Sequence, residues 1–511
     1  MTADGRSTAW FGVGAVVLVH LCVAWVWLAL DRGLPDGDVL GVIGAVEMFW
    51  ARAHGVGAWA ALAAVWTEDF GEYPALSYAV TGIASALLGV TDLDGDGPAR
   101  VALLWGAIAL SATGWLAWET SEGDGAASIW AAGLLASSPL WSATQRQVLI
   151  EDALCALVAV SAAACVAGQA RSRLGLWALG GLAAGAALLT KQTAVLALVP
   201  LAAVLARKAW ASRQWSGPAT AAGIASLLAG PWYLRRLGDE STYAFAAAAA
   251  NPDTVGPLHQ LALYPLALVQ QAWAPLLVLA LAGALYRVRD RLPRDPLLIA
   301  ALGLVLLVCI PKKYPRLLLP LLPFLAVAMG VALAQSRDRA IKGAVGALAL
   351  GSLLAGSFVG RAGPLGATEF GLTGVDERCF QRWVEPPSRV GLPWEALIAE
   401  VERSGAAHVS AVSWPAPPCA HQTSHDLGEH LRVRLRRAGL RAEVLPSFVS
   451  GDGWAERPVL ILSDGLLRCG EPVGAAGAGD PCEPGDWELV ARLPYSSPTW
   501  TLDLRLYGPT R

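Results

Sequence analysis

Residues 10–41 read WFGVGAVVLVHLCVAWVWLALDRGLPDGDVLG. The run from 10 to 30 is almost entirely apolar and long enough for one helical crossing of a bilayer. It is too long for the apolar core of a signal peptide and lacks a clear small-x-small cleavage site, so we interpret it as a retained membrane helix. Three carboxylates follow closely, at Asp31, Asp36 and Asp38. Either they solvate a loop, or they supply a general base beside the membrane surface.

The composition is that of a membrane protein. The chain has 511 residues, of which 55% are hydrophobic and only 15% are charged, and its mean hydropathy is +0.47. Soluble domains carry about one quarter charged residues, so a soluble protein is excluded. A formal net charge of -3 gives no indication of nucleic-acid binding. We expect a mainly α-helical, multi-pass protein of the cytoplasmic (inner) membrane.

A crossing needs roughly 20 mostly apolar residues, and by that length we predict about eleven membrane helices. They fall near 10–30, 99–118, 126–145, 150–170, 174–190, 193–209, 217–234, 263–285, 296–311, 317–334 and 340–360. Alternate connectors are basic, which indicates the cytoplasmic side. These connectors are 171–173, 207–213, 287–294 and 336–342. The N-terminus is then cytoplasmic, and an odd number of helices places residues 361–511 outside.

The first outer loop contains two apolar segments that are short for a crossing, 42–53 and 74–89. We expect both to lie in the membrane interface as juxtamembrane helices. The alternative is a true crossing at 74–90. That crossing would invert everything after it and would put the basic connectors outside, so we reject it.

Residues 361–511 are more polar, and their pattern predicts a small α/β domain. Two runs near the C-terminus are typical of a closing hairpin. The cysteines of this part are Cys379, Cys419, Cys469 and Cys482. They predict two disulfides in an oxidising compartment, and zinc is the alternative although no Cys-x-x-Cys spacing supports it. The predicted domains are therefore 1–360, which spans the membrane, and 361–511, which lies outside it.

Basic residues gather in the turns predicted to lie outside. They are Arg100, Arg146, Lys191, Arg235, Arg236, Lys312, Lys313 and Arg316. Positive charges on this side run against the usual trend. A shared anionic ligand at the outer membrane face would explain them.

Several stretches resemble one known group in the same order. They are LPDGDVLGVIGAVEMF (34–49), EYPALSYAVTGIASALLG (72–89) with PAR (98–100), SSPLWSATQRQVLIEDALCA (137–156), GAALLTKQTAVLALVP (185–200), PWYLRRL (231–237) and KKYPRLLLPLLPFLA (312–326). The chain resembles the integral-membrane C-type glycosyltransferases, in particular the protein O-mannosyltransferase and aminoarabinose-transferase (family 39-like) group, over about 10–335. The resemblance implies that a sugar passes from a polyprenyl-phosphate donor to a protein, lipid or glycan acceptor at the outer face.

The resemblance implies a catalytic base in the first outer loop. In the family an Asp-Glu pair follows a proline-like turn there, and Asp36 follows Pro35. The glutamate position is Gly37 in this chain, and Asp38 is the candidate second carboxylate. The alternative is that Asp36 or Asp38 caps a helix that begins near Val39.

The resemblance also implies which residues bind the lipid phosphate. The family has a basic residue where Arg100 and Lys191 stand, and a Lys/Arg-Tyr turn where Lys313, Tyr314 and Arg316 stand. Negative charge builds up on the leaving phosphate, so cations at these positions would stabilise the transition state. For Arg100 and Lys191 the alternative is that the side chain only extends to the polar interface.

Other charged or metal-binding residue types have weaker counterparts in the family. Arg146, Glu151 and Asp152 resemble an Arg/Asp turn, which makes Asp152 a further catalytic candidate; a salt bridge that fixes the turn is the alternative. Glu72 and His259 resemble a metal-binding pair of some relatives. One carboxylate and one histidine make a poor site for a divalent metal without further ligands, and the alternative is that His259 is an ordinary loop residue.

Two other classes of function remain possible from the sequence. A transporter or lipid flippase would be expected to show internal repeats and charges at the membrane midplane, and the charges here gather at one face instead. A non-catalytic membrane scaffold would tolerate the loss of Asp36. We predict a glycosyltransferase, with the sugar and the acceptor left open.

Overall fold

The computed structural model describes residues 3–31, 37–67, 74–90, 96–146, 149–235, 257–287, 289, 292–309, 315–359 and 394–404, and, further on, 408–413, 435, 438, 443–445, 459–464, 487–496 and 501–509. The contacts divide the chain into two units. The first holds most of the helices and the second holds a sheet, and each is described by itself.

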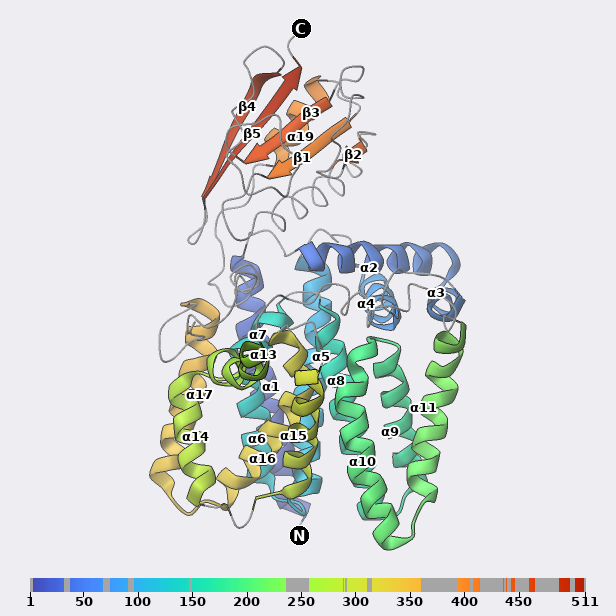
Figure 1. The fold of residues 1–511 in the computed structure, drawn as a ribbon, viewed down its shortest axis with the longest axis vertical. Helices are drawn as coiled ribbons and strands as arrows, with labels where there is room; N and C mark the ends of the chain where they lie inside the picture. The colour runs from blue at the N-terminus through green and yellow to red at the C-terminus, as the bar shows by residue number, and fades with distance from the viewer. Residues whose placement is uncertain are drawn as a thin grey trace. The chain divides into compact units, whose positions relative to one another are not determined.

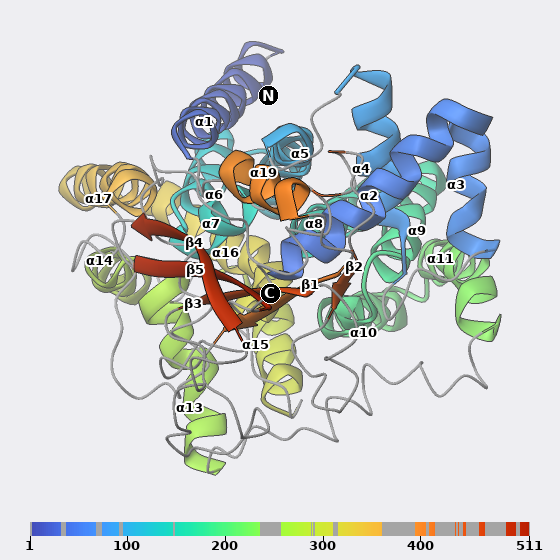
Figure 2. The same ribbon diagram turned by 90° about the horizontal axis from the view of Figure 1, so that it is seen from above.

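The first unit is a bundle whose long helices run side by side (Figures 1 and 2). Its helices up to residue 212 are α1 (Ala3–Leu30), α2 (Gly37–Val56), α3 (Ala58–Thr67), α4 (Leu76–Leu87), α5 (Asp96–Thr120), α6 (Gly125–Ala136), α7 (Pro139–Gln145), α8 (Ile150–Arg171), α9 (Leu174–Leu188), the short η1 (Gln192–Ala194) and α10 (Val195–Ser212). The later ones are α11 (Ser216–Arg235), α13 (Pro257–Ala267), the π-helical η3 (Leu268–Ala272), α14 (Pro275–Arg287), α15 (Arg294–Cys309), the 3-10 helix η5 (Pro315–Leu321), α16 (Leu322–Gln335) and α17 (Arg339–Phe358).

Among the described residues, six helical segments are long and apolar enough to cross a membrane. They are Ser7–Leu30, Gly97–Thr120, Ile150–Arg171, Gln192–Ser212, Pro315–Gln335 and Arg339–Phe358. Shorter apolar helices such as Leu174–Leu188 and Pro275–Arg287 accompany them. The protein is thus a helical membrane protein, and the count of eleven crossings stays a prediction.

Two predicted helices are each broken into two. The run 126–145 ends at Ala136 and restarts at Pro139, because the Ser138 side chain accepts a hydrogen bond from the Trp141 N–H and caps the new helix. The run 263–285 is interrupted between η3 and α14, where Trp273 is extended and Pro275 starts the next helix. Trp273 donates to the Leu134 carbonyl at 2.9 Å, which ties this break to α6.

Helix α16 lies in the core of the bundle. In an apolar 18-residue stretch of the segment from Pro315 to Gln335, 89% of the residues are buried. Gly330 allows α16 and α6 to approach closely, since a Cβ at this position would lie 2.6 Å from the Ala131 nitrogen. Small residues at such crossings are how membrane helices gain close packing.

Helix α2 lies across the ends of the bundle helices rather than along them (Figures 1 and 2). It packs on α4 at Gly82, where a Cβ would lie 2.6 Å from the Val46 carbonyl oxygen. The Trp50 indole donates to the Val90 carbonyl at 3.0 Å, in the turn that follows α4. This orientation fits the interfacial position expected for 42–53.

The basic connectors meet one another through ion pairs. Arg207 and Lys208 both contact Asp295, at 2.9 and 2.5 Å, and Arg287 pairs with Asp338. Connectors predicted to share one side of the membrane are therefore neighbours in space. Which side they face stays a prediction.

The second unit contains the helix α19 (Trp394–Ser404) and a five-stranded sheet. The strands are β1 (His408–Ser413), β2 (Glu443–Leu445), β3 (Val459–Asp464), β4 (Trp487–Ser496) and β5 (Thr501–Pro509), in the order β2-β1-β3-β5-β4. β1 is parallel to β2 and β3, whereas β5 is antiparallel to β3 and β4. The expected C-terminal hairpin is present. The assignment of 361–511 to a separate extracytoplasmic domain stays a prediction, and its four cysteines lie outside the described residues.

Candidate functional site

A cluster of buried charged side chains lies where α8 begins. Glu151 and Asp152 are in the first turn of α8, where the positive end of the helix dipole favours carboxylates. Lys191 stands in the turn between α9 and η1, and Arg316 is in η5. Residues from three separate parts of the chain thus converge in the apolar bundle.

Glu151 bridges the two cations. Its Oε1 accepts a hydrogen bond from Lys191 Nζ at 2.6 Å and lies 3.3 Å from Arg316 Nε. Only 2% of the Glu151 side chain is exposed, with 5% for Lys191 and 10% for Arg316. We name these three residues the Glu151 triad. Removing a charge from water costs free energy, and the attraction between Glu151 and the two cations offsets part of that cost.

Some carboxylate oxygens in and beside the triad lack hydrogen-bond partners among the residues that the structure describes. They are Glu151 Oε2 and both oxygens of Asp152, which is fully buried. The nearby Thr144 hydroxyl donates to the Leu140 and Trp141 carbonyls at 3.1 and 3.0 Å. Buried polar atoms normally have partners, and exceptions concentrate at functional sites. The start of α8 is therefore the best candidate site in the described structure.

Arg146, which ends α7, links three helices next to this cluster. Its guanidinium lies 4.5 Å from the centre of the Trp27 ring of α1, and Nη1 donates to the Ser357 carbonyl of α17 at 3.4 Å. The side chain thus reaches beyond the turn that the sequence suggested it would fix. Arginine is suited to this, because one planar group can stack and donate at once.

Sequence reasoning missed a buried polar pair that includes Gln145, the residue before Arg146. His20 Nε2 lies 3.0 Å from Gln145 Oε1, and both residues are buried. Gln145 also fits against Gly106, where a Cβ would lie 1.9 Å from its Oε1. A histidine in the middle of an apolar run is a signal that could have found this pair.

Arg100 has a different setting from the triad. It is exposed near the start of α5, and its guanidinium lies 5.0 Å from the centre of the Trp25 ring. A cation over an aromatic face at an exposed site fits the alternative of an interfacial anchor. Its role as a phosphate ligand stays a prediction.

The other predicted site residues lie outside the described part of the structure. Asp36, Glu72, Lys313 and Tyr314 belong to segments that are not described, and so do the side chains of Asp38 and His259. The backbone shows that α2 begins at Gly37 rather than near Val39, so Asp38 is in its first turn. No group of three or more metal-ligating side chains occurs among the described residues.

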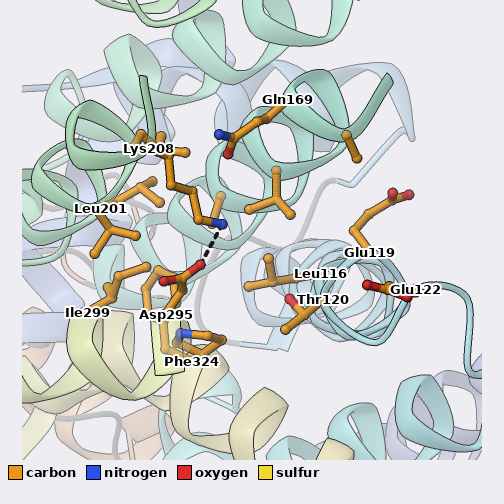
Figure 3. A pocket seen from close by; sticks show the side chains of 16 residues that line it. Leu116, Glu119, Thr120, Glu122, Gln169, Leu201, Lys208, Asp295, Ile299 and Phe324 are labelled. Atoms are coloured by element: carbon orange, nitrogen blue, oxygen red, sulfur yellow. Dashed lines mark ion pairs between the residues drawn. The ribbon is translucent and has the colours of Figure 1, made fainter. Parts of the chain in front are cut away.

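A cavity of about 300 Å³ lies at the other end of the same helices (Figure 3). Glu151 is in the first turn of α8, whereas Gln169, which lines the cavity, is in the last turn of this helix. Lys208 and Asp295 form an ion pair on one wall, and Glu119 lies across from them. The cavity and the Glu151 triad are separate features at opposite helix ends.

Comparisons with known proteins bear on the fold and on the cluster. Residues 83–233 match the model of a family described as dolichyl-phosphate-mannose-protein mannosyltransferase. This segment contains Glu151, Asp152 and Lys191. No curated protein matches the chain significantly.

Two crystal structures of ArnT from Cupriavidus metallidurans are similar over almost the whole chain. The one bound to undecaprenyl phosphate has 18% sequence identity and a TM-score of 0.58, with 97% of each chain covered. The one in the apo state has 15% identity and a TM-score of 0.54, with 98% of each chain covered. The chain has the ArnT fold. The resemblance to the mannosyltransferase and aminoarabinose-transferase group, noted from the sequence, is confirmed.

Proposed function

We propose that this protein is a membrane glycosyltransferase that takes a sugar from a polyprenyl-phosphate donor. The observation that carries the proposal is the Glu151 triad, which holds two cations in the interior of an ArnT-like fold. The ArnT structure with undecaprenyl phosphate supports a lipid phosphate as the anion. The acceptor is a protein, lipid or glycan hydroxyl.

The cations would act on the leaving phosphate. Lys191 and Arg316 are buried, so their attraction for an anion is little weakened by water. Arg100, Lys313 and Tyr314 would complete the phosphate site. Charge develops on the phosphate oxygen as its bond to the anomeric carbon breaks, and fixed cations stabilise that charge without reorganising.

A carboxylate would take the acceptor proton. In the reaction the acceptor oxygen forms a bond to the anomeric carbon, the bond from that carbon to the phosphate oxygen breaks, and the electron pair leaves with the polyprenyl phosphate. The hydroxyl proton passes to the base. We assign Asp36 as this base, with Asp38 and Asp152 as the further carboxylates of the site.

Glu72 and His259 are the only metal candidates that the resemblance suggests, and their side chains lie outside the described residues. The reaction would take place at the outer face of the cytoplasmic membrane. The N-terminus would be cytoplasmic, and residues 361–511 would form an extracytoplasmic, disulfide-bonded domain.

The first test is transfer from radiolabelled polyprenyl-phosphate sugars in membranes, with the wild type beside Asp36→Asn. We expect transfer to fall about a hundredfold or more, since the amide cannot accept the proton. Asp31→Asn is the matched control, because it removes a carboxylate from the same segment, and it should retain transfer. Equal transfer in Asp36→Asn would remove Asp36 from the mechanism. No transfer from any donor by the wild type would favour a transporter or a scaffold.

A further inference from the structure

The turn that carries Lys191 is held by two partners from outside its own helix. α9 ends at Leu188, and the last carbonyls of a helix have no partner within that helix. The Tyr233 hydroxyl of α11 donates to the Leu188 carbonyl at 3.1 Å, and the Leu76 N–H, at the start of α4, donates to the Leu189 carbonyl at 3.1 Å. Two carbonyls just before Lys191 are therefore fixed by α4 and α11.

Packing holds the Tyr233 side chain in this orientation. Its ring belongs to a small apolar cluster around Leu189, Ala229 and Trp232. The Tyr233 and Trp232 rings meet edge to face, with centroids 4.9 Å apart and an angle of 77° between their planes. Because a hydrogen bond depends on direction as well as distance, a fixed ring also fixes the carbonyl that its hydroxyl meets.

The position of the Lys191 ammonium depends on this backbone. Lys191 is extended between α9 and η1, with φ -159° and ψ 138°, and its N–H donates to the Ala187 carbonyl at 3.1 Å. Its flexible four-carbon side chain is only 5% exposed and ends 2.6 Å from Glu151 Oε1. A cation stabilises the developing charge of a leaving phosphate best from a preorganised position, and a misplacement of about 1 Å can cost roughly a hundredfold in rate.

We infer that Tyr233 is a positioning residue for Lys191: by holding the Leu188 carbonyl, its hydroxyl sets where the ammonium meets the leaving phosphate. This inference rests on the proposed function, in which Lys191 stabilises the leaving lipid phosphate. Tyr233 would contact neither the sugar nor the phosphate. The alternative is a hydrogen bond that caps α9 and contributes to stability alone.

Tyr233→Phe tests the inference, because it removes the hydroxyl and keeps the ring. The measured quantities are kcat and the donor KM for transfer from a radiolabelled polyprenyl-phosphate sugar, in membranes with equal amounts of folded protein. We expect kcat to fall about tenfold. The donor KM should change less than about twofold, because the extra negative charge of the phosphate appears in the transition state, so a misplaced cation affects the reaction more than the binding.

The same change in a Lys191→Met background separates positioning from stability. If the hydroxyl acts through Lys191, its removal has no further effect on kcat once the ammonium is absent. Lys191→Met and the double variant Tyr233→Phe, Lys191→Met should therefore have equal kcat. A hydrogen bond with a structural role alone would leave kcat of the folded protein unchanged in both backgrounds.

Trp66→Phe is the matched control. The Trp66 indole of α3 donates to the Leu228 carbonyl of α11 at 2.9 Å and packs on the same apolar cluster. Its replacement removes a comparable hydrogen bond between an aromatic side chain and a backbone carbonyl, away from the turn that carries Lys191. Trp66→Phe should lower the free energy of unfolding in detergent and leave kcat and KM near the wild-type values.

An unchanged kcat in Tyr233→Phe, or an equal fall of kcat in Trp66→Phe, would overturn the inference. A fall by the same factor in both Lys191 backgrounds, or full transfer by Lys191→Met, would overturn it as well. Should Lys191→Met be too slow to assay, kcat of Tyr233→Phe beside Trp66→Phe decides. A wild type without transfer from any donor would instead overturn the proposed function.

Discussion

Two sets of ion pairs occur at opposite ends of the same helices, and they have similar geometry but different surroundings. Lys191 and Glu151 are 2.6 Å apart, with 5% and 2% of their side chains exposed. Arg207 and Asp295 are 2.9 Å apart, with 63% and 29% exposed. A distance criterion would rank the two pairs alike.

The difference in burial separates them physically. Exposed pairs contribute little, about 0–1 kcal/mol, because water screens the charges and the side chains lose entropy. A buried pair loses its hydration, and its net contribution is small while both partners are present. Removing one partner leaves an uncompensated charge and costs far more. Surface pairs such as Arg207–Asp295 should thus tolerate change, whereas a change in the Glu151 triad should be costly.

The largest effect on stability is expected for Lys191→Met. The change removes the 2.6 Å hydrogen bond to Glu151 while Arg316 still faces that carboxylate, so we expect a loss of about 1.5–3 kcal/mol, the range for a hydrogen bond to a charged group. Arg207→Met is the matched surface control and should cost at most about 1 kcal/mol. Unfolding of both variants in detergent would give the two values. Equal losses of unfolding free energy in the two variants would show that burial does not distinguish the two ion pairs.

A smaller effect is expected for Arg146→Lys. Lysine keeps the charge, but it loses the planar group that stacks on Trp27 and donates to Ser357. We expect a loss of about 1–2 kcal/mol, which is typical of a desolvated cation–aromatic contact. Arg100→Lys, over Trp25 at an exposed position, should cost less than about 1 kcal/mol. A larger loss of stability in Arg100→Lys than in Arg146→Lys would contradict the expectation that the buried contact contributes more.

The smallest effect concerns Asp338, which caps α17 at the surface. Hydrogen bonds from the backbone N–H groups of Ile341 and Ala340, together with the neighbouring Arg287, hold the pKa of Asp338 below its ordinary value of 3.8. Because this pKa is lower in the folded state, the stabilisation is complete above the unfolded-state pKa. It is lost as the pH falls through the folded-state value.

The free energy of unfolding of the wild type and of Asp338→Asn, followed from neutral to acidic pH, checks this expectation. Asparagine can still cap the helix, so the comparison isolates the charge. The two proteins should differ at neutral pH and converge in acid. A difference that persisted unchanged at the lowest pH would contradict the assigned shift.

Local signals in the sequence predicted most helix positions in the bundle. The run expected at 150–170 is α8, Ile150–Arg171, and the run expected at 174–190 is α9, Leu174–Leu188. The breaks inside 126–145 and 263–285 were missed because apolar length outweighed the Ser-Pro and Ala-Pro signals that mark them. The sequence also singled out Asp152, Lys191 and Arg316 as candidates, and their roles stay predictions; that Glu151 bridges Lys191 and Arg316 was not predicted.

The sequence by itself determined that this is a multi-helix membrane protein with charges at the helix ends, since apolar length and charge placement are local properties. Only the tertiary structure decided which charges meet. Lys191 is 40 positions from Glu151 in the chain, and Arg316 is farther still. No local pattern encodes such pairs, because they form only when separate helices pack and remove the charges from water.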